Sequence, residues 1–66
     1  MENLKITLAA ARVNAGLTQN EVARKMKVSR HTIMKWEHNK LIPKPAEILM
    51  LSQIYNIPID NIFFRS

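Results

Sequence analysis

The chain has 66 residues, no cysteine and a formal net charge of +5 at pH 7. A chain this short is expected to form one domain, 1–66, near the lower limit of what a single hydrophobic core stabilises. The lack of cysteine excludes disulfides and thiolate metal sites, and two histidines with few nearby carboxylates do not make a metal site either. No apolar run approaches the roughly 20 residues of a membrane span, and the N-terminus lacks the regions of a signal peptide. We therefore expect a cytoplasmic protein without metal or cofactor.

The first segment has the spacing of an amphipathic helix. Apolar residues recur every three or four positions, at Leu4, Leu8, Ala11 and Ala15. This pattern predicts a helix over 2–14. Gly16 then suits the left-handed position that follows a helix, and Leu17 is expected to pack inward.

The next segment predicts two short helices around a tight turn. Thr18 and Glu21 have the spacing of a capping box, so a helix is expected to begin at Gln19. Ser29 is a suitable N-cap for a second helix, which occupies 29–37.

The helix over 29–37 has two unlike faces. One face carries Arg30, His31, Met34, Lys35 and His38, and the other carries Ser29, Ile33, Trp36 and Glu37. Ile33 and Trp36 are therefore candidates for the core, and we favour packing over base stacking for Trp36. The cationic face has a shape that a DNA major groove admits, although a merely solvated face is the alternative.

Positive charge is concentrated in the middle of the chain. Between residues 24 and 44 lie seven Lys or Arg residues against one acid, Glu37. Such a cluster indicates either a nucleic-acid surface or an ordinary solvated face, and composition alone favours neither.

The C-terminal third begins with a helix after two prolines. A residue before proline leaves the helical region, whereas Pro45 suits the first turn of a new helix. We expect four side chains of this helix to face the core, namely those of Ile48, Leu51, Ser52 and Tyr55. An apolar surplus remains near the C-terminus, and the residues that offer a dimer surface are Met50, Ile59, Phe63 and Phe64. The alternative is that a small domain simply exposes some apolar atoms.

Taken together, several motif residues resemble the helix-turn-helix of Cro/phage-repressor-type (XRE-like) DNA-binding domains. The resemblance depends on Leu17-Thr18-Gln19, Ala23, Val28 and Trp36-Glu37, and extends to Arg12, Pro43, Ile57, Ile62 and Phe63. It implies an all-α, compact five-helix, lambda-repressor-like fold, with a last helix at about 59–63. It also implies a structural ion pair between Arg12 and Glu37, for which a solvated arginine is the alternative.

The resemblance and the helix geometry assign candidate roles in DNA binding. Residues expected to contact bases are Arg30, His31, Met34 and Lys35. Arginine bonds guanine O6 and N7 together, and a methionine offers an apolar contact such as one with a thymine methyl. His31 has a plain surface histidine as its alternative, and Lys35 is equally suited to a phosphate.

Other residues are expected to hold the DNA backbone, and they are Gln19, Thr32, His38, Asn39, Lys40 and Lys44. Gln19 matches a family position whose side chain bonds a phosphate, and Thr32 suits backbone or base. Asn39 replaces the glycine usual in the family, and asparagine tolerates the left-handed conformation that a C-cap needs.

These residues predict sequence-specific binding of duplex DNA and transcriptional regulation, most simply as a repressor that occupies a palindromic operator as a homodimer. Phage, restriction-modification and antitoxin contexts all stay open. The rival prediction is a protein-interaction module that uses the apolar C-terminal surface. An enzyme is disfavoured because no nucleophile with a base and no phosphate loop is present. We expect no membrane contact and no small-molecule effector.

Overall fold

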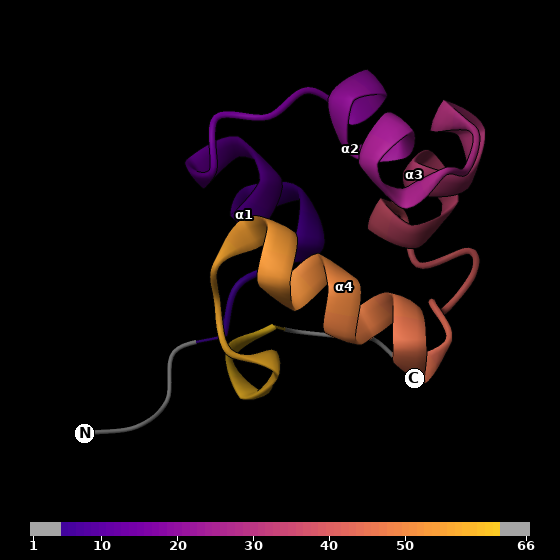
Figure 1. The fold of residues 1–66 in the computed structure, drawn as a ribbon. Helices are drawn as coiled ribbons and strands as arrows, with labels where there is room; N and C mark the ends of the chain where they lie inside the picture. The colour runs from indigo at the N-terminus through magenta and orange to yellow at the C-terminus, as the bar shows by residue number, and fades with distance from the viewer. Residues whose placement is uncertain (1–4, 63–66) are drawn as a thin grey trace.

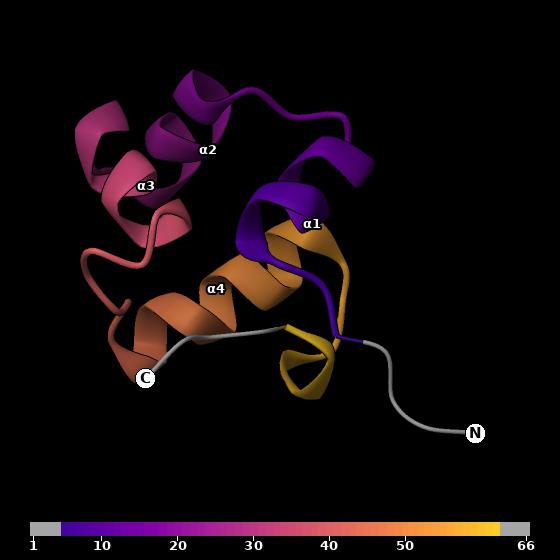
Figure 2. The same ribbon diagram turned by 180° about the vertical axis from the view of Figure 1, so that it is seen from behind.

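The computed structural model describes residues 5–62, which form a small all-α bundle. Its elements are α1 (Leu8–Asn14), α2 (Gln19–Met26), α3 (Arg30–Glu37), α4 (Pro45–Tyr55) and the 3-10 turn η1 (Ile59–Asn61). The helices α2 and α3 lie side by side at one end, and α4 runs from beneath them to α1 (Figures 1 and 2). In the part of the chain that the structure describes, no helix is long and apolar enough to cross a membrane.

The all-α class is confirmed, but the expected fifth helix is wrong. Residues 59–61 make a single 3-10 turn, and Ile62 is already extended at φ −98° and ψ 129°. Ile62 is 3% exposed, so it fills the core without helical backbone. Its neighbour in space is Ile6, whose N–H donates to the Asn61 carbonyl at 2.9 Å in an isolated parallel bridge. The extended backbone needed for this bridge ends the turn.

The first helix is shorter than predicted because Thr7 caps it. The Thr7 hydroxyl accepts from the Ala10 N–H at 3.1 Å, and α1 therefore begins at Leu8 rather than at residue 2. Leu8 and Ala11 are buried as expected, whereas Ala15 is the exposed C-cap. Leu4 lies outside the described residues. The left-handed position falls at Gly16, with φ 74°, as predicted.

The boundaries of α2 and α3 are confirmed by their caps. The Thr18 hydroxyl accepts from the Glu21 N–H at 3.1 Å, and the Glu21 carboxylate accepts from the Thr18 N–H at 2.8 Å. The bond from the Thr18 N–H, and then the Thr18 side chain, hold the pKa of the Glu21 carboxyl below its ordinary value. Ser29 accepts from the Thr32 N–H at 3.2 Å and so starts α3. Between the helices, Lys27 takes the left-handed conformation at φ 58°.

The core lies where the four helices meet. It contains Leu8, Ala11, Val22, Ala23, Met26, Ile33, Trp36, Leu51, Tyr55 and Ile62. Ile33 and Trp36 are 1% and 3% exposed, so the interpretation of Trp36 as a packing residue is confirmed. From α4, Ile54 rather than Ile48 packs against this core. Helical spacing does not distinguish the two, since Ile48 and Ile54 each lie three residues from Leu51, so packing against the neighbouring elements sets the difference.

Candidate nucleic-acid interface

The outer face of α3 carries the polar residues that the sequence assigns to DNA. The side chains of Arg30, His31, Lys35 and His38 are exposed, and those of Thr32 and Met34 are half-buried. The inner face of the same helix supplies Ile33 and Trp36 to the core. Burial of that inner face fixes the rotation of α3, so the cationic face must point to solvent.

The exposed charge of residues 24–44 is more strongly positive than their composition suggests. All of its basic side chains are exposed, namely Arg24, Lys25, Lys27, Arg30, Lys35, Lys40 and Lys44. The single acid, Glu37, points inward with a side chain only 6% exposed. The surface around α3 therefore presents positive charge with no opposing carboxylate of its own segment.

Glu37 is held inward by an ion pair with Arg12 of α1. The Arg12 Nε donates to Glu37 Oε2 at 2.7 Å and its Nη2 donates to Oε1 at 3.5 Å. The Arg12 Nη1 also donates to the Leu17 carbonyl at 2.9 Å. These contacts join α1, the loop before α2 and the end of α3. The pair thus fixes the position of α3 in the bundle.

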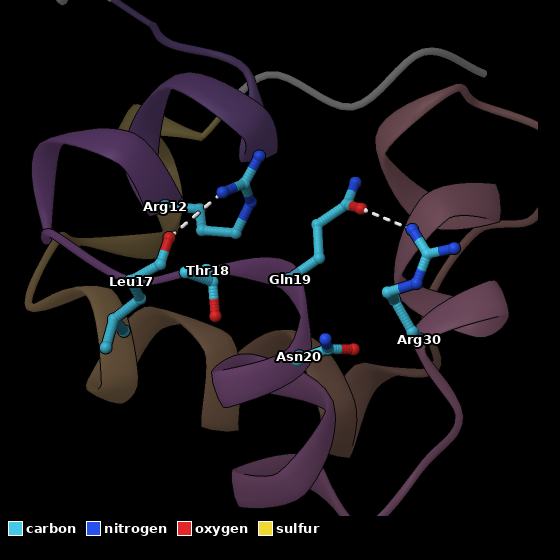
Figure 3. A pocket seen from close by; sticks show the side chains of 6 residues that line it. All are labelled: Arg12, Leu17, Thr18, Gln19, Asn20 and Arg30. Carbon is cyan, nitrogen blue, oxygen red and sulfur yellow. Dashed lines mark hydrogen bonds between the residues drawn. The ribbon is translucent and has the colours of Figure 1, made fainter.

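Gln19 extends this network from the core to the surface. Its Nε2 donates to Glu37 Oε1 at 3.0 Å, and its Oε1 accepts from Arg30 Nη1 at 3.1 Å. The same Nη1 lies 3.2 Å from the Met34 sulfur. Figure 3 shows Gln19 reaching from the start of α2 toward the Arg30 guanidinium on α3.

A hollow of about 390 Å³ surrounds these groups, and its walls are Arg12, Leu17, Thr18, Gln19, Asn20 and Arg30 (Figure 3). Its polar side chains come from Arg12 of α1, from the N-cap and first turn of α2, and from Arg30. The structure therefore brings Gln19, a candidate for backbone contact, directly beside Arg30, the first candidate for base contact.

A second hollow lies along α3 and collects most of the remaining candidates. It measures about 170 Å³ and is lined by His31, Met34, Lys35, His38 and Lys40. Asn39 follows His38, the C-cap of α3, and has φ 61°, the left-handed conformation expected of it. The turn is closed by Lys40, whose N–H donates to the Lys35 carbonyl at 2.8 Å.

Lys44 lies apart from this hollow as the exposed N-cap of α4. Its backbone N–H donates to the Glu47 carboxylate at 2.7 Å. Thr32 lies in the first turn of α3 itself, and the other backbone candidates fall into two groups, one at the start of α2 and one after α3. Two such groups on either side of an exposed helix can contact two phosphate chains that border a groove.

Comparison with known families identifies the fold. A family model described as a helix-turn-helix domain matches residues 6–64. The chain belongs to the helix-turn-helix domain family. Comparisons with curated proteins and with solved structures found no match. The helix-turn-helix assignment indicates that DNA is the partner and that the role is in transcription regulation.

The helix-turn-helix domain also exposes large apolar side chains outside α3. Met50 and Ile59 of the predicted dimer surface are 42% and 41% exposed, whereas Phe63 and Phe64 lie outside the described residues. Leu49, which the sequence placed in the same apolar surplus, is 49% exposed. The sequence interpretation missed Val13, Leu41 and Ile42, which are between 47% and 62% exposed.

Two features of the interface were not predicted from sequence. Asn20 lines the hollow beside Gln19, and its place as the second residue of α2 was the available signal. The two-sided bonding of Gln19 had no such signal, because it depends on the side-chain rotamers of three residues on two separate helices.

Proposed function

We propose that this helix-turn-helix domain binds a specific duplex DNA site as a dimer and represses transcription by occupying a palindromic operator. The observation that carries the proposal is the exposed cationic face of α3, on a helix whose opposite face is locked into the core. The groove of B-DNA admits such a helix, and side chains at its N-terminal end reach base edges.

The roles of the side chains follow from their chemistry. Arg30, the first residue of α3, donates to guanine. His31 and Lys35 donate to base edges, and the half-buried Met34 packs against a thymine methyl. Around them, Gln19, Thr32, His38, Asn39, Lys40 and Lys44 hold the phosphates. Glu37 has no catalytic role in this proposal, since both of its oxygens accept hydrogen bonds within the fold.

The dimer is proposed from the exposed apolar residues. Met50 of α4 and Ile59 of η1 offer exposed apolar surface on elements other than the groove-facing helix. Isologous pairing of two copies places two α3 helices about one DNA turn apart, ~34 Å, which requires a palindromic site.

Selection from randomised duplex DNA at near-physiological salt tests this function. We expect a palindromic motif with half-sites about one turn apart, bound roughly 10³-fold or more tighter than random DNA. A pool that stays unenriched yet binds with a steep salt dependence would show that only phosphates are contacted, and would refute sequence-specific regulation.

The exposure of Leu49 and Met50 favours a second candidate, a protein-interaction or antitoxin-type module. This candidate predicts that Met50→Asp abolishes a partner complex while Arg30→Ala and Lys35→Ala leave DNA binding unchanged. The proposed regulator predicts that Arg30→Ala weakens binding to the selected site by about 1–3 kcal/mol.

A further inference from the structure

The hollow along α3 is apolar although most of the residues around it are basic. It measures about 170 Å³, and its accessible wall is apolar. The residues that line this α3 hollow are His31, Met34, Lys35, His38 and Lys40. The wall is therefore made by the Met34 thioether, by ring carbons of the imidazoles and by the aliphatic stems of the lysines, whose charged ends extend into water.

Met34 forms the floor of the α3 hollow. It is half-buried, whereas the other lining residues are exposed. Its sulfur lies 3.2 Å from Nη1 of Arg30, one helical turn earlier. At the other end, the left-handed turn at Asn39 brings the chain back to α3, where the Lys40 N–H donates to the Lys35 carbonyl at 2.8 Å. Backbone hydrogen bonding therefore fixes the residue that lines the C-terminal end of the hollow.

An apolar hollow on a groove-facing helix favours one kind of base atom. Base edges in the major groove present donors and acceptors, and the apolar group among them is the C5-methyl of thymine. A polar base edge placed in the α3 hollow would lose its hydrogen bonds to water without gaining partners. A water molecule takes about 30 Å³ of liquid volume, so a hollow of about 170 Å³ has room for a methyl group and part of its ring. Cytosine leaves this space unfilled, whereas 5-methylcytosine carries the same methyl at the same ring position as thymine.

The charge around the α3 hollow suits the strand that would carry such a base. Lys35 and Lys40 surround the hollow with positive charge, and Glu37 of the same segment points inward with a side chain 6% exposed. An apolar floor with a cationic rim matches a methylated base whose own backbone is a row of phosphates. An uncharged apolar ligand would gain nothing from the rim, so DNA is the occupant that both features fit.

We propose that the α3 hollow binds the C5-methyl group of a pyrimidine, so that the domain distinguishes 5-methylcytosine from cytosine in its site. This inference depends on the proposed sequence-specific binding of duplex DNA. It adds that the methyl group is recognised rather than the whole thymine base, and that methylation of a cytosine at this position strengthens binding. Because the Arg30 guanidinium contacts the Met34 sulfur, we expect the methylated pyrimidine on a base pair next to the guanine that Arg30 contacts.

The test measures dissociation constants on the selected duplex with one base changed at a time. Deoxyuridine in place of thymidine removes the methyl group and keeps the O4 acceptor and the base pairing. At the sensitive position, a cytosine–guanine pair is then compared with a 5-methylcytosine–guanine pair. The variants are Met34→Ala and Met34→Leu, with Thr32→Ala as the control that shortens a side chain of α3 outside the hollow. Circular dichroism verifies that each variant is folded.

We expect one thymine in each half-site at which deoxyuridine weakens binding by about 4-fold, the factor for one buried methyl group. Changing both half-sites together should weaken binding by about 15-fold, since the two positions are independent. At the same position, 5-methylcytosine should bind about 4-fold tighter than cytosine. Met34→Ala should remove both differences, whereas Met34→Leu and Thr32→Ala should keep them. In the complex, nuclear magnetic resonance should show a nuclear Overhauser effect between the Met34 methyl and the pyrimidine methyl.

Three outcomes overturn the inference. If deoxyuridine is tolerated at every thymine, the α3 hollow contacts no methyl group. If the sensitive position persists in Met34→Ala, another part of the protein contacts the methyl. If 5-methylcytosine binds no tighter than cytosine, thymine is recognised as a whole base. A wild-type domain that selects no duplex over random DNA is a separate result, in which the proposed function itself fails and the inference fails with it.

Discussion

Replacement of Glu37 by alanine is expected to destabilise the domain strongly. The carboxylate accepts from Arg12 and Gln19, and the side chains of Glu37 and Arg12 are only 6% and 16% exposed. Breaking a buried ion pair from one side costs about 3–5 kcal/mol because the other charge is stranded. Arg12 keeps its hydrogen bond to the Leu17 carbonyl, at 2.9 Å, when Glu37 is removed. We therefore expect a loss of unfolding free energy at the lower end of this range, about 3 kcal/mol. For a domain of this size, that loss lowers the melting temperature by about 12–24 °C.

Thermal unfolding followed by circular dichroism measures the effect, with Glu47→Ala as the matched control. Glu47 accepts one capping bond from the Lys44 N–H, worth about 1 kcal/mol. The double variant Arg12→Met/Glu37→Leu removes both charges and should recover part of the stability that Glu37→Ala loses. Equal melting temperatures for Glu37→Ala and Glu47→Ala would refute the reasoning, as would a double variant less stable than Glu37→Ala.

Three further predictions concern backbone strain, pH and charge. Lys27 has φ 58°, so Lys27→Gly should be more stable than Lys27→Ala by about 1 kcal/mol in urea unfolding; equal stabilities would show that the turn carries no strain. Burial, and then the nearby Glu37, raise the pKa of Tyr55 to about 12 from 10.0. The neutral phenol is thus favoured in the fold, and the stability this contributes is complete below pH 10 and is lost as pH rises through about 12. Unfolding measured over that window should show a smaller loss for Tyr55→Phe than for the wild type, and parallel curves would contradict this. Lys40→Ala should weaken binding equally on selected and random duplexes and lower the salt slope by about 1, whereas a change in base preference would contradict a phosphate role.

The boundaries of α2 and α3 were predictable because their signals are local. Thr18 with Glu21, and Ser29 before its helix, satisfy backbone donors within three residues of themselves. The turn at Gly16 was equally local, since glycine is at ease at positive φ. Likewise, the 3.6-residue period separated the core face of α3 from its cationic face.

The errors arose where contacts between distant segments determine the backbone conformation. The apolar spacing predicted an earlier start for α1, but Thr7 caps the helix, which therefore begins at Leu8. Ile6 forms a bridge with Ile62, near the other end of the chain. The same bridge accounts for the three-residue turn where a helix was expected. No period in the sequence reports a contact between residues so far apart.

The candidate site was predictable residue by residue but not as a network. Helical spacing put Arg30, Met34 and Lys35 on one face, and the resemblance suggested the role of Gln19. The contacts of Gln19 with Glu37 and Arg30 join α2 to both ends of α3, so they emerge only when the two helices are packed. Left-handed backbone at Lys27 was likewise unforeseen, because lysine carries no preference for it.

The central claim is that the exposed face of α3 determines which DNA sequence is bound. Its most direct test is the dissociation constant for a scrambled duplex divided by that for the selected duplex, measured at near-physiological salt. This ratio is compared between the wild type and Arg30→Ala. The account predicts a ratio of about 10³ or more for the wild type and a ratio about 5- to 150-fold smaller for Arg30→Ala. An unchanged ratio in Arg30→Ala would contradict the claim that α3 carries base readout through its first residue.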